Sequence, residues 1–188
     1  MSPNHQTPTE PLKAGAFARN FRLPDRYGQL VELADVLKLG PAVVCFHRDD
    51  WDTLAAADPE VPHIQRATEA LGGTIIRIFP AENPCAVSAP DGLSATIRLA
   101  DVGCRTARAY GLSSDTSTTP QPPAADPLAI RASLVVGSDR RIVLAFIDSD
   151  CRSRIEPAMI LAALAGLRAP FRAAISSLPT PQKGHSDD

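Results

Sequence analysis

Short apolar runs, separated by polar turns, recur along the middle of the chain. The continuous run at 41–46 (PAVVCF) is typical of a strand buried on both faces of a parallel sheet. The runs at 74–79 (TIIRIF) and 96–100 (TIRLA) predict two more strands. Further on, the runs at 132–137 and 142–148 are joined by the short polar link SDRR, which predicts a hairpin.

Helical spacing of apolar residues appears between and after these strands. Residues 59–71 predict a helix that the Gly72–Gly73 pair ends, and residues 104–111 predict a short helix that Gly111 closes. The last helix, over 156–167, begins near Pro157. The predicted core stripes of the first and last of these helices are Val61, Ile64, Ala67, Thr68 and Leu71, and Met159, Leu161, Leu164 and Leu167.

Ahead of the first core strand, residues 21–37 (FRLPDRYGQLVELADVL) predict a β-hairpin with its turn at Tyr27 and Gly28, followed by a helical turn. The two ends of the chain are rich in Pro, Ser, Thr and charge, so we expect a flexible segment at 1–12 and a flexible tail at 172–188. One folded domain then covers 13–171, with a Pro-rich insert loop at 113–127.

Composition narrows the class of protein. A chain of 188 residues with 44% hydrophobic residues can bury a sizeable core, and a net charge of -2 favours neither nucleic-acid binding nor binding to an anionic membrane. No apolar stretch reaches the roughly 20 residues that span a bilayer, so we expect a soluble, cytoplasmic protein. Only three of the 19 basic residues are lysines, and this bias, with abundant Ala and Pro, suggests a bacterial origin.

Three aspartates, Asp49, Asp50 and Asp52, surround the single tryptophan, Trp51, directly after the first core strand. With His47 they could imitate a metal site, because hard cations bind carboxylate oxygens. Consecutive residues on a turning chain seldom converge on one ion, however. The sequence therefore predicts no metal site and no cofactor.

Several segments resemble one known family, in matching order and spacing. They are LKAGAFARNFRLPDRYGQLVELADVL, GPAVVCFHRDDW, LADVGCRTARAYGL, SDRRIVLAFID and RSRIEPAMILAAL. Together they resemble the alkyl hydroperoxide reductase/thiol-specific antioxidant family, and within it the peroxiredoxin-like branch. The resemblance and the element order imply a thioredoxin-like α/β fold, with a central mixed sheet flanked by helices and an N-terminal β-hairpin of the peroxiredoxin type.

The resemblance also implies that the catalytic site is degenerate. In that branch the active strand ends in a pattern like F-Y-R-G-D-W-C-P-Y-C, and here Phe46, Arg48, Asp50 and Trp51 match it. His47 replaces the aromatic residue and Asp49 replaces the glycine. Asp52 stands at the position of the peroxidatic cysteine, and Ala55 stands at that of the second cysteine. No catalytic residue is therefore intact.

Two residues keep features of the family's site. Asp52 places a negative charge where a helix should begin, and we interpret it first as a capping residue, a role that Thr53 could share. Arg131 matches the arginine that many relatives carry at the start of the late strand, near the peroxidatic sulfur. Our hypothesis is that Arg131 pairs with Asp52. The alternative is that Arg131 is a solvated residue at the end of a loop.

The four cysteines, Cys45, Cys85, Cys104 and Cys151, include no C-x-x-C pair, so no disulfide scaffold is predicted. Cys45 lies inside a core strand and is interpreted as a packing residue. Cys104, at the start of a helix and beside Arg105, is the best alternative thiol. Cys85 follows it, because its Pro-rich surroundings could expose it, and Cys151 corresponds to a substituted aromatic residue.

Two alternative functions follow from the family resemblance and the positions of the cysteines. The first is a non-catalytic binding or assembly module on a peroxiredoxin-like scaffold, with a possible homodimer and an unknown protein or small-molecule partner. The alternative is a thiol-dependent antioxidant oxidoreductase or peroxidase that uses a non-standard cysteine such as Cys104 or Cys85.

Overall fold

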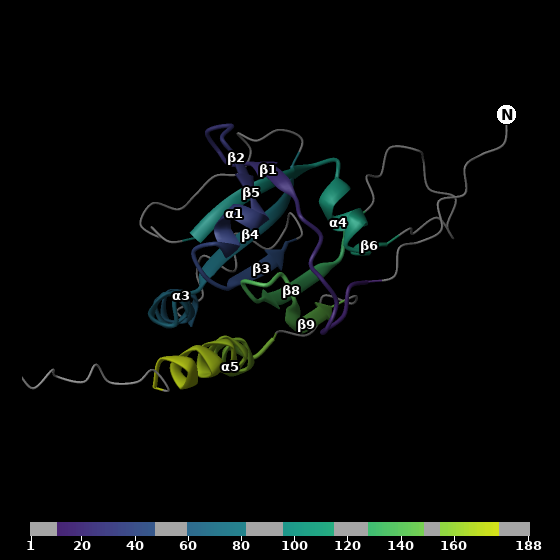
Figure 1. Cartoon of the computed structure of the whole chain (residues 1–188). Helices are drawn as coiled ribbons and strands as arrows, with labels where there is room; N and C mark the ends of the chain where they lie inside the picture. Colours follow the sequence, from purple (N-terminus) through teal and green to yellow (C-terminus); the bar gives the residue numbers. More distant parts are fainter. Residues whose placement is uncertain (1–10, 48–59, 82–95, 115–127, 149–154, 177–188) are drawn as a thin grey trace, which may run out of the picture.

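The computed structural model of the chain describes residues 11–47, 60–81, 96–114, 128–148 and 155–176 (Figure 1). At its centre is a five-stranded sheet with the order β5-β4-β3-β8-β9. β3, β4 and β5 run parallel to one another, whereas β8 is antiparallel to both β3 and β9. The strands are β3 (Ala42–Phe46), β4 (Thr74–Ala81), β5 (Thr96–Val102), β8 (Arg131–Val136) and β9 (Ile142–Asp148).

Helices and a hairpin cover the two faces of this sheet. α3 (Glu60–Ala70) and α5 (Pro157–Ser176) contact each other below the sheet in Figure 1. On the other face lie α1 (Leu33–Leu37), α4 (Arg105–Ala109) and the antiparallel hairpin of β1 (Arg22–Pro24) and β2 (Leu30–Glu32). The predicted thioredoxin-like fold, with a mixed sheet between helices and an N-terminal hairpin, is confirmed.

The alternation of side chains along β3 divides the core in two. Val44 and Phe46 point into the larger cluster, which includes Leu33 from α1 and Tyr110 after α4. Val43 points the other way, into a smaller cluster with Leu164 from α5. Both faces of β3 are thus buried, as its continuous apolar run predicted.

Three details differ from the predicted elements. α5 continues to Ser176, beyond the predicted end at 167 and into the tail that was expected to be flexible from 172. Met159 is 48% exposed and does not belong to the core stripe of α5, because the helix turns Ile160 and Leu164, four residues apart, onto the sheet. The predicted loop at 113–127 begins with a strand: β6 (Ser113–Ser114) pairs antiparallel with β7 (Leu128–Ala129). Backbone pairing therefore joins the two ends of the insert, whose residues 115–127 lie outside the described part of the chain.

The end of α3 is packed closely against the start of β3. Gly72 has a φ of +72°, and its N–H donates to the carbonyl of Glu69, which closes the helix as predicted. A Cβ on Gly40 would lie only 2.2 Å from the carbonyl oxygen of Gly72. Because only glycine fits this contact, the pair fixes where β3 enters the sheet.

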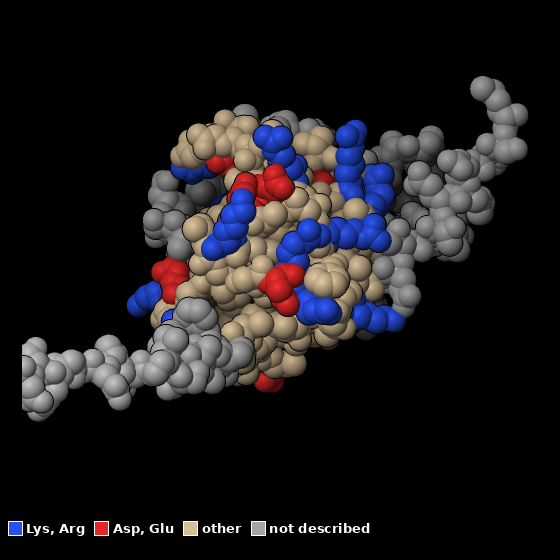
Figure 2. Space-filling view, in the orientation of Figure 1, with Lys and Arg blue, Asp and Glu red and all other residues tan. Residues whose placement is uncertain are grey.

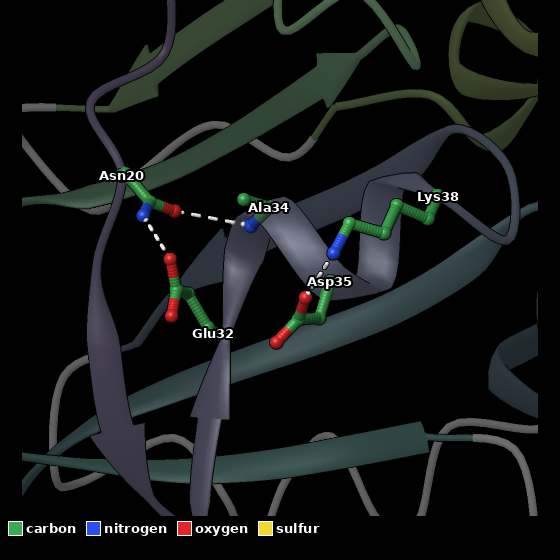
Figure 3. Close-up of polar contacts among 5 residues, drawn as sticks. All are labelled: Asn20, Glu32, Ala34, Asp35 and Lys38. Carbon is green, nitrogen blue, oxygen red and sulfur yellow. Dashed lines mark hydrogen bonds and ion pairs between the residues drawn. The ribbon is translucent and has the colours of Figure 1, made fainter.

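A remote side chain caps α1 (Figure 3). Glu32, at the N-cap position, makes no capping bond with its own side chain. Instead the Oδ1 atom of Asn20 accepts a 3.0 Å hydrogen bond from the N–H of Ala34, and its Nδ2 donates to Glu32 across 2.6 Å. Asn20 thus joins the segment before β1 to the beginning of the helix.

The N-terminal segment from Leu12 to Asn20 is bonded to elements from the second half of the chain. The N–H groups of Gly15 and Ala18 donate to the carbonyls of Ile142 and Arg140, at 2.7 and 2.8 Å. The buried Tyr110 hydroxyl donates to the carbonyl of Arg19. In Figure 1 this purple segment runs from beside β9 to β1, so it connects the late hairpin with the early one.

The surface carries both signs of charge. On the face shown in Figure 2, Lys and Arg side chains lie among uncharged residues and beside several Asp and Glu side chains. Over the described residues, no helix has both the length and the apolar character needed to cross a membrane.

Candidate functional site

The candidate site lies at the carboxyl end of β3, where His47 follows the last strand residue. The backbone N–H of His47 donates to the carbonyl of Ile78 across 2.8 Å, so the pairing with β4 continues one residue beyond β3. The next segment, 48–59, lies outside the described residues. It holds five predicted site residues, Asp49, Asp50, Trp51, Asp52 and Ala55. The capping role of Asp52 and its pairing with Arg131 therefore stay predictions.

Strand register brings a row of polar residues to one face of the sheet beside His47. Cys45 is opposite Arg77 on β4 and opposite Ser133 on β8, and Arg77 is in turn opposite Arg98 on β5. Paired residues in neighbouring strands point to the same face. This is the face that α3 and α5 cover, where Cys45 packs beside the cluster that contains Val43.

His47 is held as a neutral hydrogen-bond acceptor. The Nε of Arg77 donates to the Nε2 of His47 across 3.2 Å, so the proton of the neutral ring belongs on Nδ1. Burial lowers the pKa of His47 to about 3, and the charges of Arg77, Arg98 and Arg131 add to this effect. The histidine is therefore uncharged at neutral pH, bonded to one guanidinium group and within the electrostatic influence of two more.

Phe79 supports both His47 and Arg98. The rings of His47 and Phe79 stack with their centroids 4.7 Å apart and an interplanar angle of 15°. The Cζ atom of Arg98 lies 4.4 Å from the centroid of the same Phe79 ring, within cation–π range. Because β4 lies between β3 and β5, the two groups reach Phe79 from opposite neighbouring strands.

Arg131 begins β8 and forms an ion pair with Asp148 at the end of β9. The NH1 of Arg131 lies 3.9 Å from a carboxylate oxygen of Asp148, and the two residues are paired in register. Their side chains are only 18% and 3% exposed. Arg131 is thus a largely buried residue of the sheet and not a solvated loop residue.

Cys45, which belongs to this polar row, is a packing thiol. The hydroxyl of Ser133 donates to the Sγ of Cys45 across 3.8 Å. Burial raises the pKa of Cys45, an effect that outweighs the opposite influence of Ser133 and of the charges on Arg77 and Arg131. The thiol is therefore protonated at neutral pH and unsuited to nucleophilic attack.

Cys104 occupies the N-cap of α4 but is buried, with only 5% of its surface exposed. Asp101 fills the capping role in its place: its carboxylate accepts hydrogen bonds from the N–H groups of Thr106 and Ala107, at 3.0 and 2.8 Å. The donors at this helix end are therefore already bonded to a carboxylate. Cys85 and Cys151 lie outside the described residues.

Sequence reasoning missed most of the residues that surround His47. Arg77 and Arg98 each follow an isoleucine inside an apolar run, in TIIRIF and TIRLA. A charged residue inside each of two predicted apolar strands was the signal that could have identified them. Asp148 is the charged last residue of the run IVLAFID. Its pairing with Arg131 depends on the register of β8 and β9, which the run itself does not reveal.

Comparison with known proteins identifies the class of fold. No family model matches the chain, and no curated protein matches it. Many solved peroxiredoxin structures, in contrast, match the chain. The matches have low sequence identity and cover most of both chains. The chain thus has the thioredoxin-like fold in the form found in peroxiredoxins.

Three solved structures illustrate this likeness. Peroxidoxin BcpB from Mycobacterium tuberculosis is 22% identical, with a TM-score of 0.55, and the match covers 84% of this chain and 97% of that one. The C45S mutant of peroxiredoxin 6 from Arenicola marina is 16% identical, with a TM-score of 0.65 and coverage of 86% and 76%. Peroxiredoxin 5 from Alvinella pompejana is 17% identical, with a TM-score of 0.63 and coverage of 83% and 99%.

Proposed function

We propose that this protein is a peroxiredoxin-like protein that has lost the peroxidatic cysteine and serves as a non-catalytic binding or assembly module. One observation carries the proposal: the segment after β3, residues 47–59, contains no cysteine, and Asp52 stands where the family's reactive sulfur belongs. The peroxiredoxin fold supports this alignment, because β3 ends at Phe46 directly before that segment.

The chemistry of peroxide reduction explains why this replacement matters. A thiolate attacks the O–O bond, becomes a sulfenic acid, and is reduced by another thiol. A carboxylate cannot be oxidised and reduced in this way, so Asp52 retains the negative charge of the site without its reactivity. Arg131 lies near enough to lower the pKa of His47, which begins the segment that contains Asp52.

The described thiols do not replace the missing sulfur. Cys45 is protonated within β3, and Cys104 is buried in the larger core cluster. We further propose that the protein acts in the cytoplasm, where its thiols stay reduced, and that it forms a homodimer. Sedimentation velocity at several protein concentrations tests the dimer, and a monomer at all of them would exclude it.

Peroxide turnover tests the loss of activity. Reduced wild-type protein is mixed with hydrogen peroxide or an organic hydroperoxide in the presence of a thiol reductant, and peroxide consumption is followed. We expect a rate no higher than that of the reductant alone. We expect Asp52→Cys to exceed wild type by about tenfold or more, because it restores a sulfur at the family's peroxidatic position.

Two controls make this test specific. Asp50→Cys places a thiol in the same segment at a position where the family has aspartate, and it should remain inactive. Turnover by the wild type that disappears in Cys104→Ser or Cys85→Ser would instead establish a thiol peroxidase with a non-standard cysteine. Trapping of sulfenic acid, followed by mass spectrometry, identifies the cysteine that reacts.

A further inference from the structure

The N-terminal segment and the turn between β8 and β9 bring positive charges together. The segment contains Lys13 and Arg19 and no acidic residue. The turn contains Arg140 and Arg141, with Asp139 as its single acid. Figure 2 shows Lys and Arg side chains gathered on the side of the molecule where Figure 1 places the N-terminal segment and α4. Because the whole chain has a net charge of -2, this local excess of positive charge is a property of one surface.

Strand pairing brings an aromatic ring and two arginines to the same side of this surface. Phe17 and Arg141 are partners in an antiparallel bridge, so their side chains point the same way. The Cζ atom of Arg141 lies 4.4 Å from the centroid of the Phe17 ring, within cation–π range. Arg19 follows Phe17 by two residues, and both are exposed whereas Ala18 between them is buried. Arg19 and Arg141 thus share the outer side of the segment with Phe17.

The backbone beneath these side chains is fixed. The N–H of Ala18 donates to the carbonyl of Arg140 across 2.8 Å, and the NH2 of Arg140 donates to the carbonyl of Ala18 across 3.0 Å. The buried Tyr110 hydroxyl donates to the carbonyl of Arg19. The surface is therefore preformed, and a preformed surface loses little conformational entropy when it binds a partner.

The two outer guanidinium groups keep donors that a partner can use. The NH1 of Arg141 donates to the carbonyl of Gly15 across 3.3 Å, and its Nε lies 3.8 Å from a carboxylate oxygen of Asp139. The Arg141 side chain is 53% exposed, and a guanidinium has five N–H donors, so these contacts do not exhaust it. Asp139 is 62% exposed, so solvent screens its attraction for Arg141. The guanidinium of Arg19 makes no hydrogen bond or ion pair with any described residue.

The chemistry of this surface favours an acidic protein segment as its partner. Carboxylates match the donor fork of a guanidinium bidentately, and an arginine stacked on a ring can still bind them through its edge. Phe17 is 55% exposed, so it offers an apolar contact between the charges. Nucleic acid fits less well, because its binding depends on neutralising many phosphates, whereas few cations gather here and Asp139 lies among them.

We propose that Phe17, Arg19 and Arg141 form the centre of a docking surface for an acidic segment of a partner protein, with an apolar side chain of that segment packed against Phe17. The inference rests on the proposed function in one respect, because it names the kind of partner that the binding module takes. The surface uses no residue of the segment 47–59 and is separate from the candidate site.

A defined peptide tests the surface on the full chain. The probe is a fluorescein-labelled peptide of glutamates with one central leucine, and binding is followed by fluorescence anisotropy. We expect saturable binding that weakens with added salt, and binding of the matching glutamine peptide that is weaker by about tenfold or more. Equal affinity for both peptides, or no binding of the glutamate peptide, would overturn the proposal. Tighter binding of a single-stranded DNA of equal length would overturn the choice of partner.

Charge variants locate the bound peptide. Arg19→Gln and Arg141→Gln should each weaken binding by about fivefold, because each removes one exposed cation from the surface. Arg26→Gln is the matched control: Arg26 also lies over an exposed ring, that of Tyr27 at 4.6 Å, but in the turn between β1 and β2. It removes the same charge and should bind like wild type. An equal loss in Arg26→Gln would overturn the assignment, because it would indicate general attraction.

Two further variants give changes that a merely structural role would not produce. Asp139→Asn keeps the acceptor for the Arg141 N–H but removes the acid, so it should tighten binding by about threefold. Phe17→Ser should weaken binding of the leucine peptide by about threefold and leave a peptide with central serine unaffected. Weaker binding by Asp139→Asn, or equal losses of both peptides with Phe17→Ser, would contradict the proposal.

The peroxide assay is independent of these measurements. A protein that shows no peroxide turnover and does not bind the glutamate peptide keeps the proposed loss of the peroxidatic cysteine and loses this inference. A protein that turns over peroxide and binds the peptide through Arg19 and Arg141 loses the non-catalytic function and keeps the docking surface.

Discussion

The Nε of Arg77 donates to the Nε2 of His47 across 3.2 Å, and this bond requires an unprotonated ring nitrogen within the electrostatic influence of three guanidinium groups. Protonation of His47 would remove the acceptor and add a positive charge that theirs disfavour. The stability of the fold should therefore depend on pH through this one side chain.

We expect acid to destabilise the protein through His47. Its pKa is about 3 in the folded state and about 6.5 in an unfolded chain, so the unfolded state binds more protons between these values. The contribution of neutral His47 to the free energy of unfolding is then fully present above pH 6.5. It decreases as the pH falls from there towards 3, by at most about 1.4 kcal/mol per pH unit. Urea unfolding at a series of pH values measures this slope.

His47→Gln supplies the comparison for this slope, because its amide oxygen can accept from Arg77 but does not titrate. We expect this variant to show a flatter profile between about pH 6.5 and about pH 4. His63→Gln, at an exposed position of α3, is the control and should retain the wild-type profile. Parallel profiles for wild type and His47→Gln would contradict the assignment.

The ion pair of Arg131 and Asp148 should be worth more than a surface pair. Asp148→Asn leaves a largely buried guanidinium without its carboxylate, and we expect a loss of about 3 kcal/mol in the free energy of unfolding. Lys38→Gln breaks the exposed pair with Asp35 and should leave stability nearly unchanged, because solvent screens that pair. Chemical denaturation of both variants at neutral pH gives the comparison, and equal losses would show that burial has no effect here.

Asn20 should stabilise α1 from outside the helix. Asn20→Ala removes the acceptor for the Ala34 N–H and the donor to Glu32, so we expect a loss of about 1 kcal/mol. Asn20→Asp keeps the acceptor but places a carboxylate against Glu32. We expect this repulsion to lower stability, and adding Glu32→Gln to the Asn20→Asp variant should restore it. Thermal unfolding of the three variants measures the effect, and no recovery in the double variant would contradict it.

Asp101 should determine the order of α4. Its carboxylate is buried and accepts two backbone N–H bonds, so Asp101→Ala should lower the free energy of unfolding by about 2 kcal/mol. Asp101→Asn keeps one acceptor oxygen and should lose less. Backbone hydrogen exchange at Thr106 and Ala107 measures the local effect, and unchanged protection of these two amides in Asp101→Ala would contradict it.

The sequence predicted the sheet well because its signals are local. The continuous apolar run of β3, the hairpin turn at Gly28 and the helix stop at Gly72 each depend on neighbouring residues. The predicted core stripe of α5 was wrong at Met159, because a small difference in phase decides which side of a helix faces the sheet.

The candidate site could be predicted only in part. Arg131 was predicted as a site residue because it matches an arginine of the family. In the structure it is largely buried beside Asp148, and its charge acts on His47. Arg77 and Arg98 are far apart in the sequence, and only the parallel register of β4 and β5 brings them together. The periodicity of apolar residues contains no information about which residues of two strands are paired. The proximity of Arg77 and Arg98 could therefore be found only from the structure.

The hydrogen bonds of the N-terminal segment have a consequence for how the protein is made. Gly15 and Ala18 leave the ribosome long before their carbonyl partners, Ile142 and Arg140, are synthesised. The segment from Leu12 to Asn20 can therefore dock only after the hairpin of β8 and β9 has been made. Contacts of such wide sequence separation slow folding, so we expect refolding after dilution from denaturant to be rate-limited by this closure, in contrast to a bundle of neighbouring helices.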